Sequence, residues 1–298
     1  MQVERRGSFI GMGITARYFD TELGRWTHTG WTPAAGDPLA WAVERIWDFD
    51  GMASHPQERV FPNGLIELIL QLDERYVDVL PEGLRLTPAA CVTGIQSGPI
   101  VVRAPRRRVR VLAVRMHPAG AWAIFGHPLH ELVDRTVDLE TLLGGAAREL
   151  VERCADVASG IERVRLTVAW LRGRLLGGHV AETHSGVRWV AERIAESGGR
   201  APIAALSAEA GLSDGRLAAL FRQQVGLTPK RLARIHRFGR ALGLLADAGR
   251  PLARIAVDSG YCDQPHMTAE FRELAGLTPG ALRAATRYPD TTSLAEAT

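Results

Sequence analysis

The chain has 298 residues, of which 46% are hydrophobic and 23% charged, which argues against a disordered chain and predicts two domains with sizeable cores. No apolar run is long enough to cross a membrane as a helix, and the first residues lack the pattern of a signal peptide, so we expect a cytoplasmic protein. The net charge of +3 is uneven, because residues 186–288 hold 15 Lys and Arg against nine Asp and Glu, and the rest of the chain is net negative.

Residues 41–138 are predicted to form a small antiparallel sheet or barrel. Turn signals such as Asp50-Gly51 and Pro62-Asn63-Gly64 separate short apolar stretches in this region. Leu65 to Leu72 and Val109 to Met116 have the length and alternation of strands. Residues 1–40 receive no assignment and are treated as an N-terminal extension.

Beyond Pro118 the spacing of apolar residues changes to that of helices. Residues 139–180 are predicted to be a helical connector that ends near Gly177-Gly178. Its apolar face has two uses that stay open, since it can pair with a second copy of the chain in a homodimer or pack on the barrel of its own chain. The predicted helices are Ala119–Phe125, Leu129–Val133, Leu139–Val157 and Ile161–Leu176.

A helical segment occurs twice in the last third of the chain. Leu220-Phe221-Arg222 and Gly226-Leu227-Thr228-Pro229 correspond to Glu270-Phe271-Arg272 and Gly276-Leu277-Thr278-Pro279, at an offset of 50 residues. The glycine before each segment is offset by only 49, from Gly211 to Gly260, so the second turn holds one more residue. A supporting helix, a glycine turn and a second helix predict a helix-turn-helix in each copy. An αα-repeat solenoid usually needs more than two copies.

The two copies divide into buried and outward residues at helical spacing. Leu217, Leu220 and Phe221 should bury against the first supporting helix, while Ser213 is placed to cap the next one. Pro229 opens a long helix that ends near Asp247 and carries a basic face. We therefore expect an all-α DNA-binding domain over residues 181–288, followed by a tail over residues 289–298.

Residues 186–288 resemble the paired helix-turn-helix domain of AraC-type bacterial transcription regulators. Besides the repeated segments, the resemblance is carried by Ala210-Gly211-Leu212-Ser213 and by the run from Gly260 to Met267. It implies a sequence-specific regulator without enzymatic activity, double-stranded DNA and RNA polymerase as partners, and two recognition helices that enter successive major grooves. The expected DNA-binding residues are Ser213, Arg216, Arg222, Gln223, Lys230, Arg234, Arg237, Gln264, His266, Thr268 and Arg272.

The recognition helices depart from the family in having short side chains where long base-reading ones are common. Short side chains can touch a thymine methyl group but cannot make bidentate contacts to guanine or adenine. Base reading is therefore expected from Arg216, Gln264, His266 and Thr268, or partly from DNA shape. Phosphate contacts are expected from Arg222, Lys230, Arg234, Arg237 and Arg272. The short residues are Gly215, Ala218, Ala219, Pro265 and Ala269.

Residues 41–145 resemble the cupin-like sensing domain of one subgroup of these regulators, which makes the predicted fold class α+β. The resemblance is carried by Arg59–Gly64, Gly94–Gln96, Val114–Ala121 and Leu129–Leu143. It implies a one-component regulator that responds to a small-molecule effector. The candidate ligand residues are Trp47, Phe49, Phe61, Glu67, Arg115 and Trp122. The four aromatic residues are also explained as core, and Glu67 as an outward strand carboxylate.

No metal or other cofactor is predicted. His127 and His130 lie three residues apart but have no clear third ligand. The arginines at positions 103, 106, 107, 108 and 110 suit an anionic effector, extra DNA contacts or an exposed loop.

Two alternative functions stay open. One is a regulator that acts through a protein partner without a ligand. The other is a DNA-alkylation repair enzyme with an AraC-like domain, which would need a cysteine cluster or a Pro-Cys-His-type motif. Neither Cys91 nor Cys154 stands in such a sequence, and the three cysteines are expected to be reduced.

Overall fold

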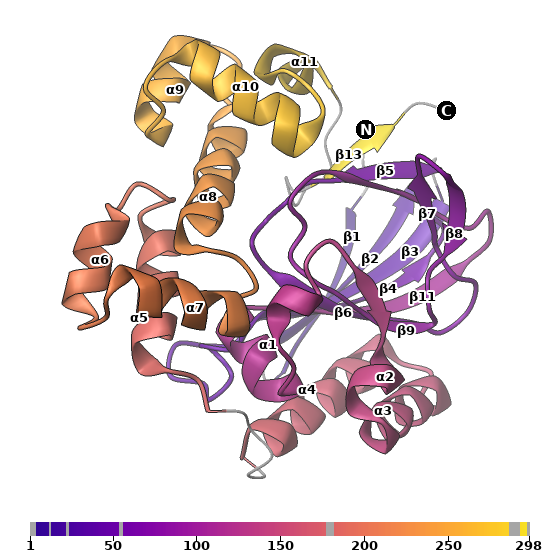
Figure 1. The fold of residues 1–298 in the computed structure, drawn as a ribbon. Coiled ribbons are helices and arrows are strands. Elements are labelled where there is room, and N and C mark those ends of the chain that lie inside the picture. Colours follow the sequence, from indigo (N-terminus) through magenta and orange to yellow (C-terminus); the bar gives the residue numbers. More distant parts are fainter. Residues whose placement is uncertain are drawn as a thin grey trace.

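The computed structural model describes residues 4–11, 13–21, 24–53, 56–176, 182–285 and 293–296. A β-rich N-terminal part lies beside a helical C-terminal part (Figure 1), which confirms the α+β class. Among the described residues, no helix is long and apolar enough to cross a membrane.

The larger layer of the N-terminal part is an eight-stranded antiparallel sheet. It includes three strands from the predicted N-terminal extension, so residues 1–40 contribute to the same sheet as the domain that follows them. In spatial order the strands are β1 (Glu4–Gly11), β2 (Ile14–Thr21), β3 (Gly24–Trp31), β4 (Val43–Gly51), β11 (Val109–Met116), β6 (Ile66–Gln71), β9 (Ala90–Thr93) and β12 (Thr136–Asp138).

A second, five-stranded sheet also draws on distant parts of the chain. Its order is β13 (Ser293–Glu296), β5 (Gln57–Val60), β10 (Ile100–Arg103), β7 (Val77–Leu80) and β8 (Gly83–Leu86). Ser293–Glu296, within the predicted tail over residues 289–298, pairs antiparallel with β5. The remaining tail residues and the Gly177-Gly178 boundary lie outside the described residues.

The alternation along β11 separates two faces of the large sheet. Leu112, Val114 and Met116 are fully buried in the core that the sheet shares with the neighbouring helices. Arg115 points to the other face, because successive side chains of a strand alternate. The apolar face is thus covered by helices, and the opposite face carries charged side chains.

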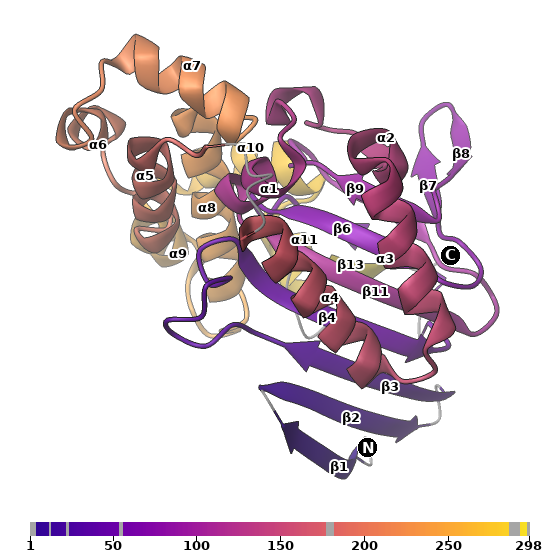
Figure 2. The ribbon, with the colours of Figure 1, turned by 90° about the horizontal axis from the view of Figure 1, so that it is seen from below.

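The helices after β11 pack on this apolar face. They are α1 (Pro118–Phe125), the 3₁₀-helix η1 (Leu129–Glu131), α2 (Leu139–Leu143), α3 (Gly145–Asp156) and α4 (Gly160–Leu176). Figure 2 shows α3 and α4 lying across the strands of the large sheet. Leu150, Val164 and Leu171 are buried in the shared core, so this apolar face is used within the chain. The predicted helix Leu139–Val157 breaks at Gly144, which has φ of 54°.

A buried ion pair fixes α4 to the sheet. Nε and Nη2 of Arg163 donate to the two carboxylate oxygens of Asp48 on β4, at 2.6 and 2.9 Å, and both side chains are at most 1% exposed. A bidentate pair of this kind adds geometric definition to the packing of apolar side chains. The helical connector is thereby part of the N-terminal domain.

The C-terminal helices surround a central helix, α8, which runs between two groups of shorter ones (Figure 1). They are α5 (Ser185–Glu196), α6 (Ile203–Glu209), α7 (Asp214–Gln224), α8 (Pro229–Leu244), α9 (Leu252–Ser259), α10 (Gln264–Ala275) and α11 (Pro279–Ala284). A hydrophobic core joins α8 to α9, α10 and α11, and it also contains Phe61 from the N-terminal domain.

Candidate nucleic-acid interface

The first repeat forms a helix-turn-helix from α6 and α7. Gly211 has φ of 67°, a left-handed conformation that glycine adopts without steric cost. The hydroxyl of Ser213 accepts a hydrogen bond from the Arg216 amide at 3.3 Å and so caps α7. Leu217 and Phe221 are at most 1% exposed, so the buried face is the one that the spacing predicts.

The second repeat, α9 and α10, shows where its additional residue lies. The Leu212 amide donates to the Ser207 carbonyl at 3.1 Å, and the Tyr261 amide donates to the Ala256 carbonyl at 2.9 Å. These turn bonds correspond at an offset of 49 residues, whereas the capping residues Ser213 and Asp263 correspond at 50. The additional residue is therefore the exposed Cys262, between the turn and the cap of α10.

The recognition helices present polar side chains beside short ones. On α7, Arg216, Arg222 and Gln223 are exposed, whereas Ser213 is engaged as the cap. On α10, Gln264 and Arg272 are exposed, and His266 and Thr268 are half-buried. The short residues Gly215, Ala219, Pro265 and Ala269 are exposed among them. Each helix thus presents a few long polar side chains among short ones.

The three predicted phosphate-binding residues of α8 differ in their surroundings. Lys230, the second residue of α8 after Pro229, is exposed. Arg234 forms ion pairs with Glu270 and Glu273 of α10. Arg237 donates to the Gly199 carbonyl at 3.4 Å, and its guanidinium lies 5.5 Å from the centre of the Tyr261 ring. Two of the three cations are therefore engaged inside the domain.

Sequence reasoning missed residues that organise α10. Asp263 caps this helix by accepting a hydrogen bond from the His266 amide at 2.7 Å. Its signal was present, because an Asp before a proline in the first helical turn is a typical helix start. Glu270 and Glu273 were missed because no local pattern indicates a partner 36 or more residues away.

Charged and aromatic side chains gather on the opposite face of the large sheet. Two guanidinium groups lie over the ring of Trp47, with Arg45 4.7 Å and Arg115 5.2 Å from its ring centre. Arg115 of β11 donates to Glu67 on the neighbouring β6 at 2.7 Å. Phe49 follows Trp47 by two residues on β4 and shares its face. Four of the six candidate ligand residues therefore share one face of the sheet.

The other two candidate ligand residues lie elsewhere. Phe61 is 2% exposed and packs against Phe238 of α8, with 6.1 Å between ring centres. Trp122 belongs to α1 on the helix-covered side of the sheet, and its indole nitrogen donates to the Glu182 carbonyl at 3.1 Å. Phe61 nevertheless lines the same pocket as Arg115, whereas Trp122 does not.

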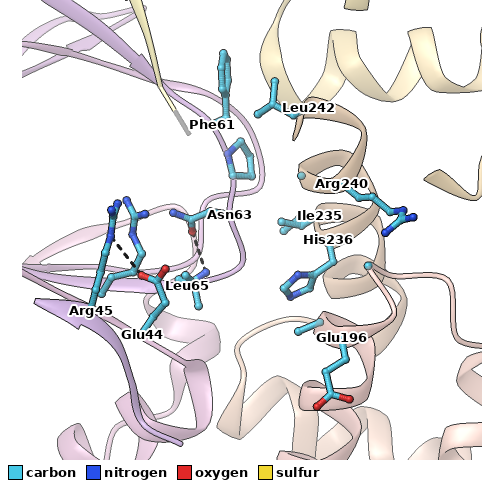
Figure 3. Close-up of a pocket in the computed structure, with 15 residues that line it drawn as sticks. Glu44, Arg45, Phe61, Asn63, Leu65, Glu196, Ile235, His236, Arg240 and Leu242 are labelled. Carbon is cyan, nitrogen blue, oxygen red and sulfur yellow. Dashed lines mark hydrogen bonds and ion pairs between the residues drawn. The ribbon is translucent and has the colours of Figure 1, made fainter. Parts of the chain in front are cut away.

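A pocket of about 480 Å³ lies between the N-terminal domain and the helices α5 and α8. Figure 3 shows Arg45 and Asn63 on one side and Ile235 and His236 on the other. Arg115 also lines it, so the pocket reaches the charged face of the sheet. Desolvation and, to a lesser extent, the nearby His117 lower the pKa of His236 to about 4.

Three arginines of the run before and within β11 are paired with acidic groups. Arg107 pairs with Glu74, Arg108 with Asp50, and Arg110 with Asp73. The Arg110 hydrogen bond lowers the pKa of Asp73. These ion pairs join neighbouring strands and loops and reduce the positive charge available to an anion.

His127 and the two buried cysteines bear on the metal and alkyl-transfer alternatives. His127 contacts Glu131 at 3.1 Å, and no group of three potential metal ligands is found among the described residues. Cys91 is 1% exposed, and burial raises the pKa of its thiol to about 12. Burial also raises the pKa of the Cys154 thiol.

Two sequence families match separate parts of the chain. Residues 206–285 match the family described as "Helix-turn-helix domain", and residues 32–138 match a "Domain of unknown function (DUF6597)". The second match begins within the region that was treated as an extension.

Curated relatives match between a quarter and a third of the chain. The chain is 34% identical over 77 residues to the "Probable transcriptional regulator LumQ" of Photobacterium leiognathi, which covers 26% of this chain and 31% of that protein. It is 29% identical over 97 residues to the arabinose operon regulatory protein of Escherichia coli, and this match covers 33% of this chain and 32% of that protein. The chain thus spans about a third of the length of these relatives. Among solved structures, ToxT from Vibrio cholerae aligns with a TM-score of 0.43 and 8% identity, over 80% of this chain and 96% of that one.

Proposed function

Since its C-terminal domain is a paired helix-turn-helix domain of the AraC type, we propose that the chain is a sequence-specific DNA-binding transcription regulator. The observation that carries the proposal is the pair of capped helices, α7 and α10, which are joined through α8 and present exposed polar side chains. Such a protein acts where the bacterial chromosome lies, in the cytoplasm.

We assign the exposed polar residues to two kinds of contact. Arg216 and Gln264, in the first turns of α7 and α10, are proposed to read bases, because the start of a recognition helix points into the major groove. Arg222, Lys230 and Arg272 are proposed to contact phosphates. Arg234 and Arg237 are left out of this set, because their guanidinium groups are engaged inside the domain.

Selection of bound fragments from genomic DNA tests the function. We expect a site with two unlike half-sites. Gln264→Ala should relax the preference in one half-site at a cost of about 1–3 kcal/mol. Lys230→Gln should weaken binding to all sequences and lower the slope of log K against log salt by about one. The proposal fails if the wild-type protein binds selected and random DNA equally.

A small-molecule effector is proposed to bind in the pocket between the domains. Its volume is in the range of ligand sites, and it combines polar groups such as Arg45 and Asn63 with apolar Ile235 and Leu242. A ligand that touches both domains binds one relative arrangement better than another, and it therefore shifts the population of the arrangement that binds DNA.

Filling the pocket tests the effector site. Gly239 of α8 lines the pocket, and a Cβ atom added there meets no atom within 4 Å. Gly239→Leu should therefore start a side chain in open space at the pocket wall and abolish the melting shifts that pocket-binding compounds cause. Gly243→Leu is the matched control on the same helix, because Gly243 is equally open but does not line the pocket. A compound that shifts melting of the wild-type and Gly239→Leu proteins equally does not bind there.

DNA-alkylation repair is the less favoured function. Transfer of an alkyl group requires a thiolate, and burial raises the pKa of the thiols of both Cys91 and Cys154. Cys262 is exposed but belongs to the turn of the second helix-turn-helix. Intact mass after incubation with methylated DNA tests this alternative, since transfer would add the mass of the alkyl group.

A further inference from the structure

The side chain of Arg234 bridges the central helix and the second recognition helix. Its Nε donates to Oε1 of Glu270 at 2.7 Å, and its Nη2 donates to Oε2 of Glu273 at 2.6 Å. The two glutamates are three residues apart on α10, so they lie on neighbouring turns of one helix face. One rigid guanidinium thus holds two points of α10.

The surroundings of Glu270 make this contact necessary. Its side chain is only 7% exposed, and a buried carboxylate is costly unless it is paired and hydrogen-bonded. His266 Nε2 lies 3.9 Å from the same carboxylate, and this carboxylate also contributes, after burial, to raising the pKa of the Tyr261 phenol. The hydrogen bonds that Arg234 donates to Glu273 and Glu270 raise the pKa of its guanidinium. The positive charge of Arg234 therefore neutralises acidic groups of its own domain.

The first repeat has no counterpart to this bridge. At the offset of 50 residues, Leu220 and Gln223 stand where α10 has Glu270 and Glu273. The end of α7 is held by other means. Gln224 accepts a hydrogen bond from the His184 amide at 3.0 Å, and the turn at Gly226 approaches the Leu129 carbonyl of the N-terminal domain.

We propose that Arg234 is a positioning residue that fixes the second recognition helix on α8, and that it is not a phosphate contact. A planar guanidinium that donates two hydrogen bonds restrains both the distance and the rotation of its partner, whereas a lysine ammonium is a flexible point charge. The proposal rests on the proposed function only in taking α10 as a DNA-reading helix.

Amide hydrogen exchange without DNA tests the bridge itself. Glu273→Gln is the main variant, because this side chain is 58% exposed and its loss should not unfold the domain. We expect faster exchange in α10 and unchanged exchange in α7, and we expect Arg234→Lys to have the same pattern. Arg231→Gln, an exposed residue of the same helix, should leave exchange in α10 unchanged. Unchanged exchange in α10 of both bridge variants would overturn the proposal.

DNA binding distinguishes positioning from phosphate contact. With the selected site, Arg234→Lys should weaken binding by about tenfold, the scale of one lost charge-assisted hydrogen bond, at an unchanged salt slope. On DNA in which the half-site that Gln264→Ala identifies is scrambled, Arg234→Lys and wild type should bind with equal affinity. Full binding by Arg234→Lys, together with a slope lowered by about one in Arg234→Gln, would instead identify a phosphate contact and overturn the proposal.

The two arms separate this proposal from the proposed function. If the wild-type protein binds no preferred DNA sequence but the bridge variants still speed amide exchange in α10, the proposed function is wrong and the bridge stands as a structural element. If preferred binding is found and the variants neither loosen α10 nor affect its half-site, the function stands and the bridge proposal fails.

Discussion

His236 shows how the fold changes the chemistry of a single residue. Its side chain lines the pocket between the domains, where Gly64 and Leu232 also lie close. Desolvation lowers its pKa from the ordinary 6.5 to about 4, and desolvation also lowers the pKa of His117 beside it. Both imidazoles are therefore neutral in the folded protein at pH values where an unfolded chain begins to protonate them.

The pH dependence of stability follows from this difference. Because the unfolded chain binds more protons below pH 6.5, the free energy of unfolding should fall as the pH drops from about 6.5 to about 4. His236 should account for about 2 kcal/mol of the loss in free energy of unfolding at pH 5. Urea unfolding of wild type and His236→Gln at pH 7 and pH 5 should show a smaller loss in the variant. The exposed His130→Gln serves as the control, and an equal loss in all three proteins would contradict the assignment.

At the scale of elements, the sequence predicts those features that depend on a local pattern of residues. The turn glycines, the cap Ser213 and the apolar spacing of α7 are all local, and the structure has each of them as predicted. Strands β1 to β3 were missed because their strand pairing, rather than a marked alternation, makes them part of the sheet. The break at Gly144 was missed because an isolated glycine is tolerated in many helices.

The candidate sites divide in the same way. Exposed residues such as Arg216 and Gln264 could be identified from helical spacing alone. The internal engagement of Arg234 could not, since its partners lie on another helix. Phe61 was predicted to line a ligand cavity, and it does line the pocket between the domains, but the sequence gives no sign that the C-terminal domain also buries its ring. Its place in the C-terminal core depends on how the two domains dock.

At the scale of the whole molecule, Phe61 connects the domains. It contacts Phe238, and the rings of Phe238 and Phe271 are 4.8 Å apart at their centres. An aromatic side chain of the N-terminal domain thus completes the core beneath the second recognition helix. The two domains should therefore not be independent in stability.

Substitution of Phe61 measures this dependence. Phe61→Ala should lower the free energy of unfolding by about 3–5 kcal/mol, because it leaves a cavity in a closed core, whereas Phe61→Leu should cost less. Denaturant unfolding followed by far-ultraviolet circular dichroism gives both values. A matched control is Leu84→Ala, since Leu84 is 59% exposed. A cost for Phe61→Ala no larger than that of the control would show that the domains are uncoupled at this point.

The extra residue Cys262 has a consequence for the geometry of the DNA site. Proteins that bind as two-fold dimers present identical helices and read palindromes, which look the same from either end. Here one chain carries two recognition helices that differ in sequence and in the turn that leads into them. We expect its operator to have a polarity, so that an inverted operator would turn the bound protein, and its N-terminal domain, to face the other way along the duplex.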